Sequence, residues 1–574
     1  MINQPVLHVL RFPRIHYKLF STHRNGLLVS ENQLPTTERG RDGKTVEYTR
    51  GRFIFDENEQ LDKRRIWFDM DALASVAASS AGATKCVEIQ RCPDGLYNKV
   101  FVLLIDNGKE LVAKLPNPNA GVPYYTTASE VATMEFAREF LQTPAPRVYA
   151  WNSSRDTKNN PVGAEYIVME RIPGIQLSEI WCNLQLKQKL KVFTQIARYM
   201  RKWTSVNFSQ IGSLYYTENM PVMSNEPLYS ENGNAAFNSR FTVGPSTNRE
   251  WSDAGRGDLK CNSGPWRSVA DYRKAIGDRE MMAVKTITHV PKQLAMLYGP
   301  NPLYQPSAEK KLEALQCYSQ IQDILLPQEP SLNTVHLWHN DLHEENIFVD
   351  PDSLEIQGII DWQSTHIAPL ADHCLDPSFL GYEGPDVGDN LEKPGLPDEI
   401  KALKSEEREA AVAEYLDKVV MIGWRRLVRD KNPSQHQAIR FQQSAAGSLL
   451  HLSRRIFEAG EPHFLALLLD LRDEWMNSEM PRFPLKFTDE EVNSIEADVE
   501  RAELGVRTMK LIQRQLGDLW PEKDVVAHEN YEEAKAALQQ VKSEIIDEFK
   551  TCPGWSSQVF ESLWPFDQIS NTDT

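Results

Sequence analysis

A short polar stretch near the middle of the chain carries residue types that could bind a metal ion and accept a proton. Residues 339–350 read HNDLHEENIFVD, in which Asp341 is followed by Asn346, and a second apolar run, LEIQGIID, ends at Asp361. A hairpin of these two runs brings its open ends together, so Asn346 and Asp361 become neighbours, with Asp341 in the loop just before them. Carboxylate and amide oxygens are ligands that Mg²⁺ prefers, and Asp341 could accept a proton from a hydroxyl.

This set of residues matches the phosphoryl-transfer pattern of kinases, in which one Asp is the base and an Asn and a second Asp hold metal ions. A kinase also needs a strand lysine for the α- and β-phosphates and a helix acid that holds the lysine. Lys114 lies in the apolar run ELVAKLP, and Glu130 follows it in the next helical pattern. Glu135 is the alternative partner of Lys114, and the sequence leaves this choice open.

The elements that must position these residues begin with a small sheet. Two apolar runs flank an Asn-Gly turn, which is a strong hairpin signal. Helical spacing precedes and follows this hairpin, and two further strand-like runs come next. The predicted elements are helices at 68–83 and 129–141 and strands at 99–105, 110–115, 147–151 and 165–169.

The chain becomes helical after residue 177, as expected of a second, larger lobe. Helical patterns cover 177–204, 267–290 and 308–326, and amphipathic helices follow beyond about 385, one opened by a capping box at Thr488–Glu491. Between them, residues 205–268 are rich in Asn, Ser, Gly and Pro, which predicts an irregular insertion that closes over the acceptor as a lid. Its aromatic residues, available to cover a ligand, are Phe237, Phe241, Trp251 and Trp266.

The first thirty residues differ from all that follow, because they contain Arg and Lys, interleaved apolar residues and no acid before Glu31. Such a start is typical of a mitochondrial presequence, which must respond to the membrane potential. A basic tail without structure stays open as the alternative. We therefore expect a mitochondrial location, or otherwise a cytoplasmic one, and a polar arm at 31–67.

The details depart from eukaryotic protein kinases. The catalytic loop reads His-Asn-Asp, the metal Asp is followed by Trp362-Gln363, and the loop over the phosphates is CPDGLYNKV in place of a glycine string. Over residues 85–380 the chain instead resembles the aminoglycoside-phosphotransferase and choline-kinase-like branch, whose loop reads HxDxxxxN and whose metal motif is IIDW. The stretches YNKVFVLLIDNGKELVAKLP and GPWRSVADYRKAIGDRE resemble the fungal family named altered inheritance of mitochondria protein 9.

This resemblance implies an α+β, two-lobed protein-kinase-like fold with a small β-rich N-lobe and a large, mostly helical C-lobe. It implies ATP and Mg²⁺ as cofactors, with Asp341 as the base. The remaining roles fall to Lys114 for phosphate, Glu130 to orient Lys114, Asn346 and Asp361 for the metal, and the backbone of Met169, Glu170 and Ile172 for adenine. We therefore expect the chain to divide into a presequence at 1–30, an arm at 31–67, an N-lobe at 68–169, a C-lobe at 170–480 and a C-terminal helical extension at 481–574. The C-lobe would contain the catalytic loop at 339–346 and the insertion at 205–268.

Bulk properties narrow the function further. The 574 residues carry a formal charge of −17, which argues against a nucleic-acid surface, and no apolar run is long enough to span a membrane. The seven cysteines form no CxxC pair. We therefore predict an ATP-dependent phosphotransferase acting on a hydroxyl of a small molecule, with a pseudokinase scaffold that binds a partner protein as the alternative. The acceptor is not named by the sequence, although the net acidity favours a cationic one.

Overall fold

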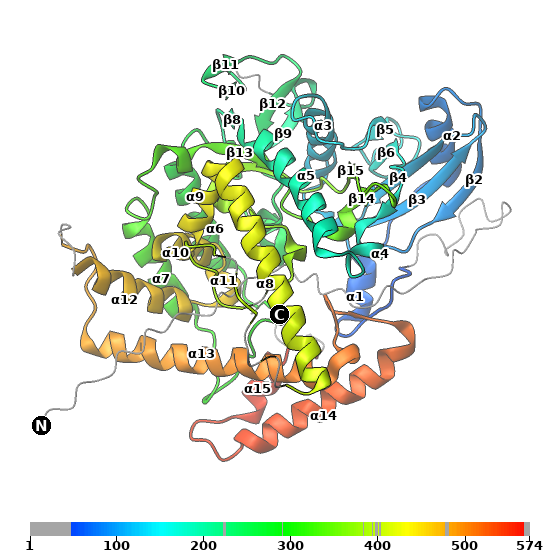
Figure 1. Cartoon of the computed structure of the whole chain (residues 1–574). Helices are drawn as coiled ribbons and strands as arrows, with labels where there is room; N and C mark the ends of the chain where they lie inside the picture. Colours follow the sequence, from blue (N-terminus) through cyan, green and yellow to red (C-terminus); the bar gives the residue numbers. More distant parts are fainter. Residues whose placement is uncertain are drawn as a thin grey trace, which may run out of the picture.

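The computed structural model describes residues 48–567, apart from 222–225, 290, 383, 393, 397–399, 401–402 and 477–481. The predicted presequence at 1–30 lies outside these residues. Figure 1 shows a small sheet at one corner of the molecule, with a larger helical body beside and below it. The N-lobe sheet is antiparallel with strand order β2-β3-β4-β6-β5. Its strands are β2 (Cys86–Arg91), β3 (Asn98–Ile105), β4 (Glu110–Pro116), β5 (Val148–Asn152) and β6 (Tyr166–Glu170).

Two helices complete the N-lobe. Helix α2 (Met70–Ser80) begins at Asp69, whose carboxylate accepts a hydrogen bond from the Ala72 amide at 2.9 Å. This is the capping interaction expected of an Asp ahead of a helical pattern. Helix α3 (Tyr125–Glu139) is buried along most of its length, so it is held by packing more than by propensity.

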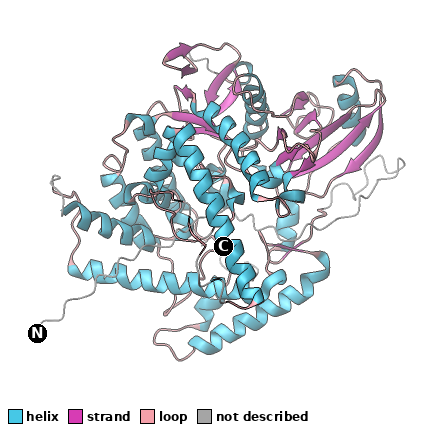
Figure 2. Ribbon diagram, in the orientation of Figure 1, coloured by secondary structure: helices cyan, strands magenta, loops and turns pink. Residues whose placement is uncertain are grey.

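The C-lobe is mostly helical, and its strands are short, two to four residues each (Figure 2). A three-stranded sheet of order β15-β14-β7 supports the polar stretch identified in the sequence: β7 (Ile175–Gln176), β14 (Ile347–Val349) and β15 (Ile356–Ile359). Strand β13 (Val335–Trp338) pairs antiparallel with β16 (His366–Pro369). The main helices are α4 (Leu177–Trp181), α5 (Leu186–Thr204), α6 (Val269–Thr286), α7 (Ala308–Ile321), α8 (Ser405–Lys431), α9 (Pro433–Gln442), α10 (Ala445–Ser453), α11 (Ile456–Ala459) and α12 (Pro462–Met476).

The segment at 205–268 is not the irregular lid that its composition predicts. It contains two small antiparallel arrangements, β11-β10-β8 and β12-β9. Phe241, Trp251 and Trp266 are almost fully buried in the main core, so these three aromatics cannot cover a ligand; only Phe237 is exposed, at 71%. The prediction of a lid lined by these aromatics is therefore wrong for three of the four. The segment's strands are β8 (Val206–Phe208), β9 (Ser213–Tyr216), β10 (Tyr229–Glu231), β11 (Asn234–Ala236) and β12 (Phe241–Gly244).

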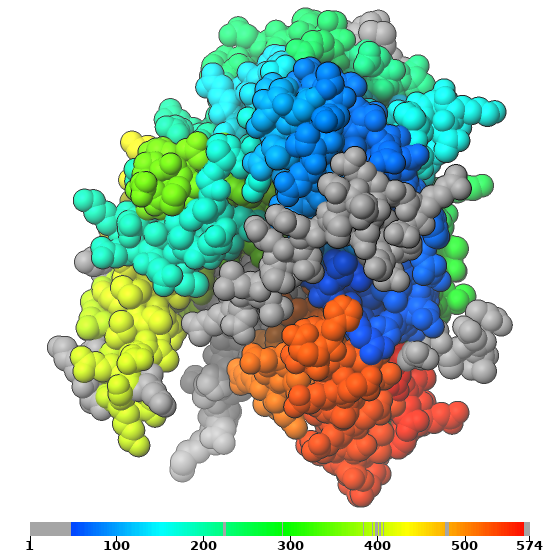
Figure 3. All heavy atoms as spheres, turned by 90° about the vertical axis from the view of Figure 1, so that its right-hand side faces the viewer, coloured from blue at the N-terminus to red at the C-terminus, as the bar shows by residue number. Residues whose placement is uncertain are grey.

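The described part of the arm, residues 48–67, is packed rather than extended as a polar linker. Strand β1 (Arg52–Phe53) pairs with β17 (Val525–Val526) of the C-terminal extension, and Ile54 and Phe55 lie in the core of that extension. Figure 3 shows the arm lying directly against the C-terminal helices. The composition could not reveal this, because the apolar partners of the arm lie more than four hundred residues later. The remaining elements are α1 (Glu57–Asp62), α13 (Asp489–Leu516), α14 (Tyr531–Phe549) and α15 (Ser557–Leu563), and α13 carries the predicted capping box between Thr488 and Glu491.

Candidate active site

Lys114 joins the two lobes. It lies on β4 in the centre of the N-lobe sheet, and its amine donates hydrogen bonds to Glu130 Oε1 and to Asp361 Oδ1, each at 2.7 Å. Lys114 and Glu130 are both nearly fully buried. Burial disfavours the charged amine, but the charges of Asp361 and Glu130 outweigh it and raise the pKa of Lys114. Lys114 therefore stays cationic between its two carboxylates.

The structure decides between the two candidate partners of Lys114. Glu130 lies in the second turn of α3, facing the sheet, and contacts Lys114 directly. Glu135 lies on another face of the helix. It accepts a hydrogen bond from Tyr216 and forms an ion pair with Arg240, and both of these residues are in the inserted segment. The helical turn separates these two faces, which is why spacing along the chain left the choice open.

The catalytic-loop residues gather at one end of β14. The side-chain amide of Asn346 donates to the backbone carbonyl of Asp341 at 2.9 Å, and the amide of Ile360 donates to the Asn346 carbonyl at 2.9 Å. His339 Nε2 donates to the Ile360 carbonyl at 2.9 Å, and burial lowers the pKa of His339. His339 is therefore a neutral imidazole that holds the loop against the end of β15.

Asp341 is the exposed acid of this loop, with a side chain that is 57% accessible. Its Oδ2 lies 3.6 Å from His343 Nε2. Burial raises the pKa of Asp341, but the interaction with the neighbouring His343 outweighs this and lowers it. Asp341 is thus held as a carboxylate with a free face. His343 lies beside this acid.

Asp361 follows β15 with φ near +60°, a left-handed conformation that is uncommon for residues other than glycine. The indole of Trp362 is buried and donates to the Ile359 carbonyl at 2.9 Å, which fixes the turn. Because Lys114 takes Asp361 Oδ1, the second carboxylate oxygen remains for another cation. Backbone strain of this kind is held in place by surrounding packing and is common at functional sites.

One contact between the two lobes was not predicted from the sequence. Asn98 at the start of β3 and Gln363 exchange two hydrogen bonds, at 3.1 and 3.2 Å, so the N-lobe and the segment after Asp361 are tied at a second point. The available signal was position alone, since Gln363 directly follows the IIDW motif and Asn98 closes the predicted phosphate loop.

The loop between β2 and β3, residues 92–97, is braced from inside by a carboxylate. Asp94 is buried and accepts hydrogen bonds from Lys99 at 2.8 Å, Arg91 at 2.9 Å and the Thr49 amide at 3.2 Å. A glycine-rich loop would offer backbone amides without such a brace. The loop is thus held by ion pairs and by the arm.

The segment that connects the lobes runs along β6 into a tight turn. Met169 pairs with Val112 of β4, and the Glu170 amide donates to the Arg147 carbonyl at 2.8 Å. Gly174 has φ near +90°, and a Cβ there would lie 2.3 Å from the Val349 carbonyl oxygen, so only glycine fits. That the backbone of Met169, Glu170 and Ile172 contacts adenine stays a prediction. The amide of Glu170 already donates a hydrogen bond to the Arg147 carbonyl.

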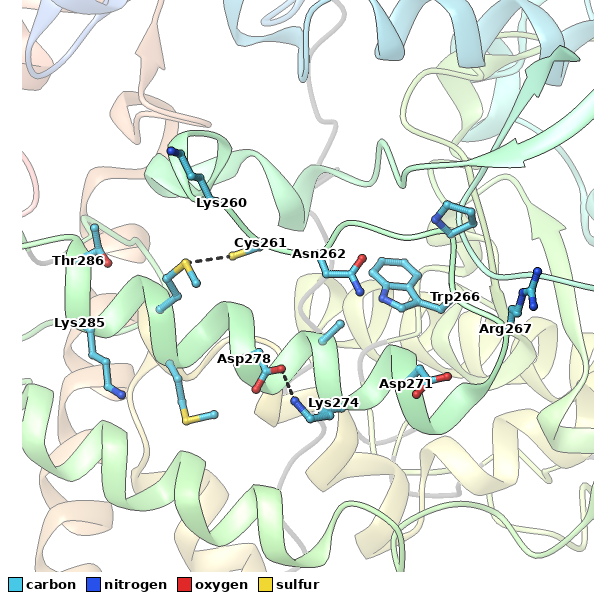
Figure 4. A pocket seen from close by; sticks show the side chains of 14 residues that line it. Lys260, Cys261, Asn262, Trp266, Arg267, Asp271, Lys274, Asp278, Lys285 and Thr286 are labelled. Carbon is cyan, nitrogen blue, oxygen red and sulfur yellow. Dashed lines mark hydrogen bonds and ion pairs between the residues drawn. The ribbon is translucent and has the colours of Figure 1, made fainter. Parts of the chain in front are cut away.

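A cavity of about 770 Å³ lies elsewhere, between α6 and the loop at 260–267 (Figure 4). It is bordered by Lys274, which pairs with Asp278 at 2.6 Å, and by Cys261 and Trp266. None of the residues predicted for catalysis, nucleotide binding or metal binding lines it. This cavity is therefore separate from the Lys114–Asp361 centre.

The site residues all lie in segments that match a known protein family. The family model described as the phosphotransferase enzyme family matches residues 88–236 and 286–372, which include Lys114, Glu130, Asp341, Asn346 and Asp361. The predicted resemblance is confirmed. The structure has the predicted α+β, two-lobed kinase-like fold, with a sheet-rich N-lobe and a mostly helical C-lobe.

Two curated relatives are similar to slightly more than half of this chain. A subtelomeric hrmA-associated cluster protein of Aspergillus fumigatus is 31% identical over 352 residues, which cover 56% of this chain and 66% of that protein. The protein named altered inheritance of mitochondria protein 9, mitochondrial, of Lachancea thermotolerans is 26% identical over 325 residues, or 52% of this chain and 51% of that protein. This chain thus spans 66% or less of the length of these two relatives. Among solved structures, an ADP-bound aminoglycoside phosphotransferase is 12% identical with a TM-score of 0.31, covering 75% of this chain and 98% of its own.

All seven cysteines are free, without disulfide bonds. Within the described residues, no group of three or more His, Cys, Asp or Glu side chains could hold a metal ion, and no helix is long and apolar enough to cross a membrane.

Proposed function

We propose that this protein is an ATP-dependent phosphotransferase that transfers the γ-phosphoryl group to a hydroxyl of a small molecule. The observation that carries the proposal is Lys114, held at 2.7 Å by both Glu130 and Asp361. A structural ion pair would need only one acid. A lysine shared between a helix acid and an acid on the opposite lobe is what phosphate binding at the lobe interface requires.

Each side chain has a role that its geometry suits. Lys114 contacts the α- and β-phosphates, and Glu130 keeps its amine in place. Asp341 accepts the proton of the attacking hydroxyl, since its carboxylate is exposed and kept ionised by His343. The backbone of Met169, Glu170 and Ile172 contacts adenine. Catalysis then consists mainly of positioning and charge stabilisation.

The donor set fits magnesium. Asp361 keeps one carboxylate oxygen beyond its bond to Lys114, and Asn346 uses its amide nitrogen for Asp341, which leaves its amide oxygen. Two hard protein oxygens suffice for Mg²⁺, which takes its other ligands from phosphates and water. When bound, the ion neutralises charge on the transferred phosphoryl group.

A pseudokinase scaffold is the second candidate, and one observation favours it. The buried Asp94 carboxylate braces the loop that would cover the phosphates, and negative charge there opposes nucleotide binding. Against this, Asp94 is paired with Arg91 and Lys99, so its charge is largely compensated within the loop.

A thermal-shift titration with ATP, with and without Mg²⁺, separates nucleotide binding from its absence, because a ligand of the folded state raises the Tm. We expect a magnesium-dependent rise in the parent protein that Asp361→Ala loses. No rise in the parent would exclude the kinase proposal.

Catalysis is tested by incubating the protein with labelled ATP and a metabolite extract. We expect a labelled product that Asp341→Asn reduces by about 10²–10⁴-fold, the range for loss of a general base. Nucleotide binding should be nearly unchanged in that variant. A protein that binds ATP and labels nothing would be the pseudokinase.

We also propose that the protein acts in mitochondria. The support is the acid-free basic start of the chain, together with relatives whose printed names include the word mitochondrial.

A further inference from the structure

The phosphate loop, residues 92–97, is held from outside by an arginine of the inserted segment. The guanidinium carbon of Arg249 lies 3.6 Å from the centre of the Tyr97 ring, and one terminal nitrogen of Arg249 donates to the Asn119 carbonyl at 3.1 Å. Tyr97 is the last residue of the loop, and Asn119 lies in the turn that follows β4. Arg249 therefore contacts the N-lobe at two points from a segment of the C-lobe.

The two points on the N-lobe are joined to each other through Asn117, which is buried. The Asn117 amide donates to the Tyr97 carbonyl at 2.8 Å, and the side-chain nitrogen of Asn117 donates to the Leu96 carbonyl at 2.9 Å. The Asn119 amide in turn donates to the side-chain oxygen of Asn117 at 2.9 Å. A contact of Arg249 with either point therefore restrains the end of the phosphate loop.

Arg249 itself stands on a fixed base in the C-lobe. Its Nε and one terminal nitrogen donate to the two carboxylate oxygens of Asp253, at 3.0 and 2.7 Å, and this fork sets the direction of the guanidinium. The residue before it, Asn248, lies with its side-chain nitrogen 3.0 Å from a ring nitrogen of His366 in β16. Two residues further on, Trp251 is buried in the main core. The backbone that carries Arg249 is thus anchored on both sides.

The inserted segment also holds helix α3 of the N-lobe. Arg240 pairs with Glu139 at 2.9 Å, and the Tyr124 hydroxyl just ahead of the helix donates to the Asn219 carbonyl at 2.8 Å. Figure 1 shows α3 between the strands of the inserted segment and the N-lobe sheet. Because these contacts restrain rotation of the N-lobe against the C-lobe, the phosphate loop is the part that must yield when a nucleotide enters or leaves.

The contacts of Arg249 are of a strength suited to a loop that opens during turnover. The Arg249 side chain is 27% exposed, so water can replace its contacts when the loop lifts. A guanidinium over an aromatic ring and a hydrogen bond to a carbonyl each contribute roughly a factor of five to an equilibrium. Together they keep the loop closed for most of the time without locking it.

We propose that Arg249 is a positioning residue that clamps the phosphate loop in its closed position, so that the inserted segment sets the rate at which the nucleotide enters and leaves. This inference rests on the proposed function, since the nucleotide site is the one assigned there. Asp253 aligns the guanidinium, and the Tyr97 ring receives it. In this role the inserted segment acts on the nucleotide side of the cleft, in place of the acceptor lid that its composition predicts.

The test follows the binding and release of a fluorescent ADP by stopped flow, with the full chain and Mg²⁺. Arg249→Met keeps the length of the side chain and removes both contacts. We expect the dissociation rate to rise about tenfold and the association rate to rise severalfold, so that Kd changes less than the dissociation rate. Loss of an ordinary nucleotide contact would raise the dissociation rate alone. Arg267→Gln is the control, because the Arg267 side chain lies in the same segment, is 72% exposed and pairs with Glu226 at 3.3 Å.

A second variant guards against misfolding of Arg249→Met. Tyr97→Leu removes the ring from the other side of the contact and should raise both rates, by a smaller factor because the bond from Arg249 to Asn119 remains. The double variant should match Arg249→Met alone, since both changes remove the same contact. Unchanged rates in both single variants, a rise in the dissociation rate alone, or additive effects in the double variant would overturn the inference.

Amide hydrogen exchange of the nucleotide-free protein separates the clamp from the proposed function. Amides of residues 92–97, among them that of Gly95, which donates to the Asn98 carbonyl at 3.0 Å, should exchange faster in Arg249→Met than in the parent. Unchanged exchange would overturn the clamp whatever the nucleotide does. Faster exchange in a protein that binds no fluorescent ADP would defeat the kinase proposal, and with it the role in nucleotide exchange, but would support Arg249 as the residue that holds the loop.

Discussion

Lys114 Nζ lies 2.7 Å from Asp361 Oδ1, although 247 positions separate the two residues in the chain. The bond crosses from the central strand of the N-lobe to a strained turn in the C-lobe. The opening between the lobes is therefore spanned by an ion pair that a nucleotide and its metal would have to share. Glu130 completes the set from α3. These three residues supply the first stability prediction.

Lys114→Met should destabilise the fold by about 3–5 kcal/mol, because it leaves the Glu130 carboxylate buried without a partner. The double variant Lys114→Met/Glu130→Leu should recover much of this loss, since the buried charge is then gone. Urea unfolding of the parent, both single variants and the double variant measures the coupling. Additive losses in the double variant would show that the pair is not coupled.

His343→Gln should move the acid limb of the pH profile of kcat/KM to higher pH. Asp341 acts as a carboxylate, and the neighbouring His343 lowers its pKa, so activity in the parent extends further toward acid than an ordinary Asp would allow. Removing the imidazole removes that effect, and the limb follows the pKa upward. His528→Gln, at an exposed site, is the control. An unmoved limb would mean that Asp341 is not the titrating base.

Asn98→Ala or Gln363→Ala should weaken Mg²⁺–ADP binding by about fivefold, without a large change in stability. Each removes the pair of hydrogen bonds that joins the lobes, and a net hydrogen bond contributes about 1 kcal/mol. The double variant should be no weaker than either single one, because both remove the same contact. Calorimetry measures the affinities. Gln357→Ala, at a half-buried position of β15, should leave them unchanged.

Phe241→Ala should destabilise the protein by about 3–5 kcal/mol, the usual cost of removing a buried aromatic side chain. Phe237→Ala, four residues earlier but 71% exposed, should change stability by about 0.5 kcal/mol or less. Thermal and urea unfolding of the two variants tests whether the inserted segment is part of the core. Equal, small effects would restore the view of this segment as a detachable lid.

Residues 1–30 fused to a fluorescent protein should direct it to mitochondria, and reversing the charge at Arg11 and Arg14 should stop this. Import of a basic, acid-free segment depends on positive charge moving with the membrane potential. Microscopy with a mitochondrial marker measures the outcome. A fusion that stays diffuse would identify the segment as a basic tail.

Local signals predicted the N-lobe hairpin and the positions of the main helices well. The Asn-Gly turn separates β3 from β4, and Thr488 caps α13 through Glu491, because both depend on residues that are adjacent in the chain. The prediction of a loose lid at 205–268 was wrong because the structure of this segment depends on residues that are distant in the chain. Its Gly and Asn content resembles a loose loop, but Phe241 and Trp266 are buried by contacts with distant elements.

The amino-acid sequence by itself determined the type and order of the site residues: a strand lysine, a helix acid, and Asp341, Asn346 and Asp361 around one hairpin. Such motifs are readable because hairpin geometry brings residues close in sequence together in space. Only the tertiary structure decided that Glu130 rather than Glu135 contacts Lys114, and that the arm lies against the C-terminal extension. Those relationships depend on which helix face packs inward and on how the arm pairs with β17, and both result from burial of apolar surface across the whole chain.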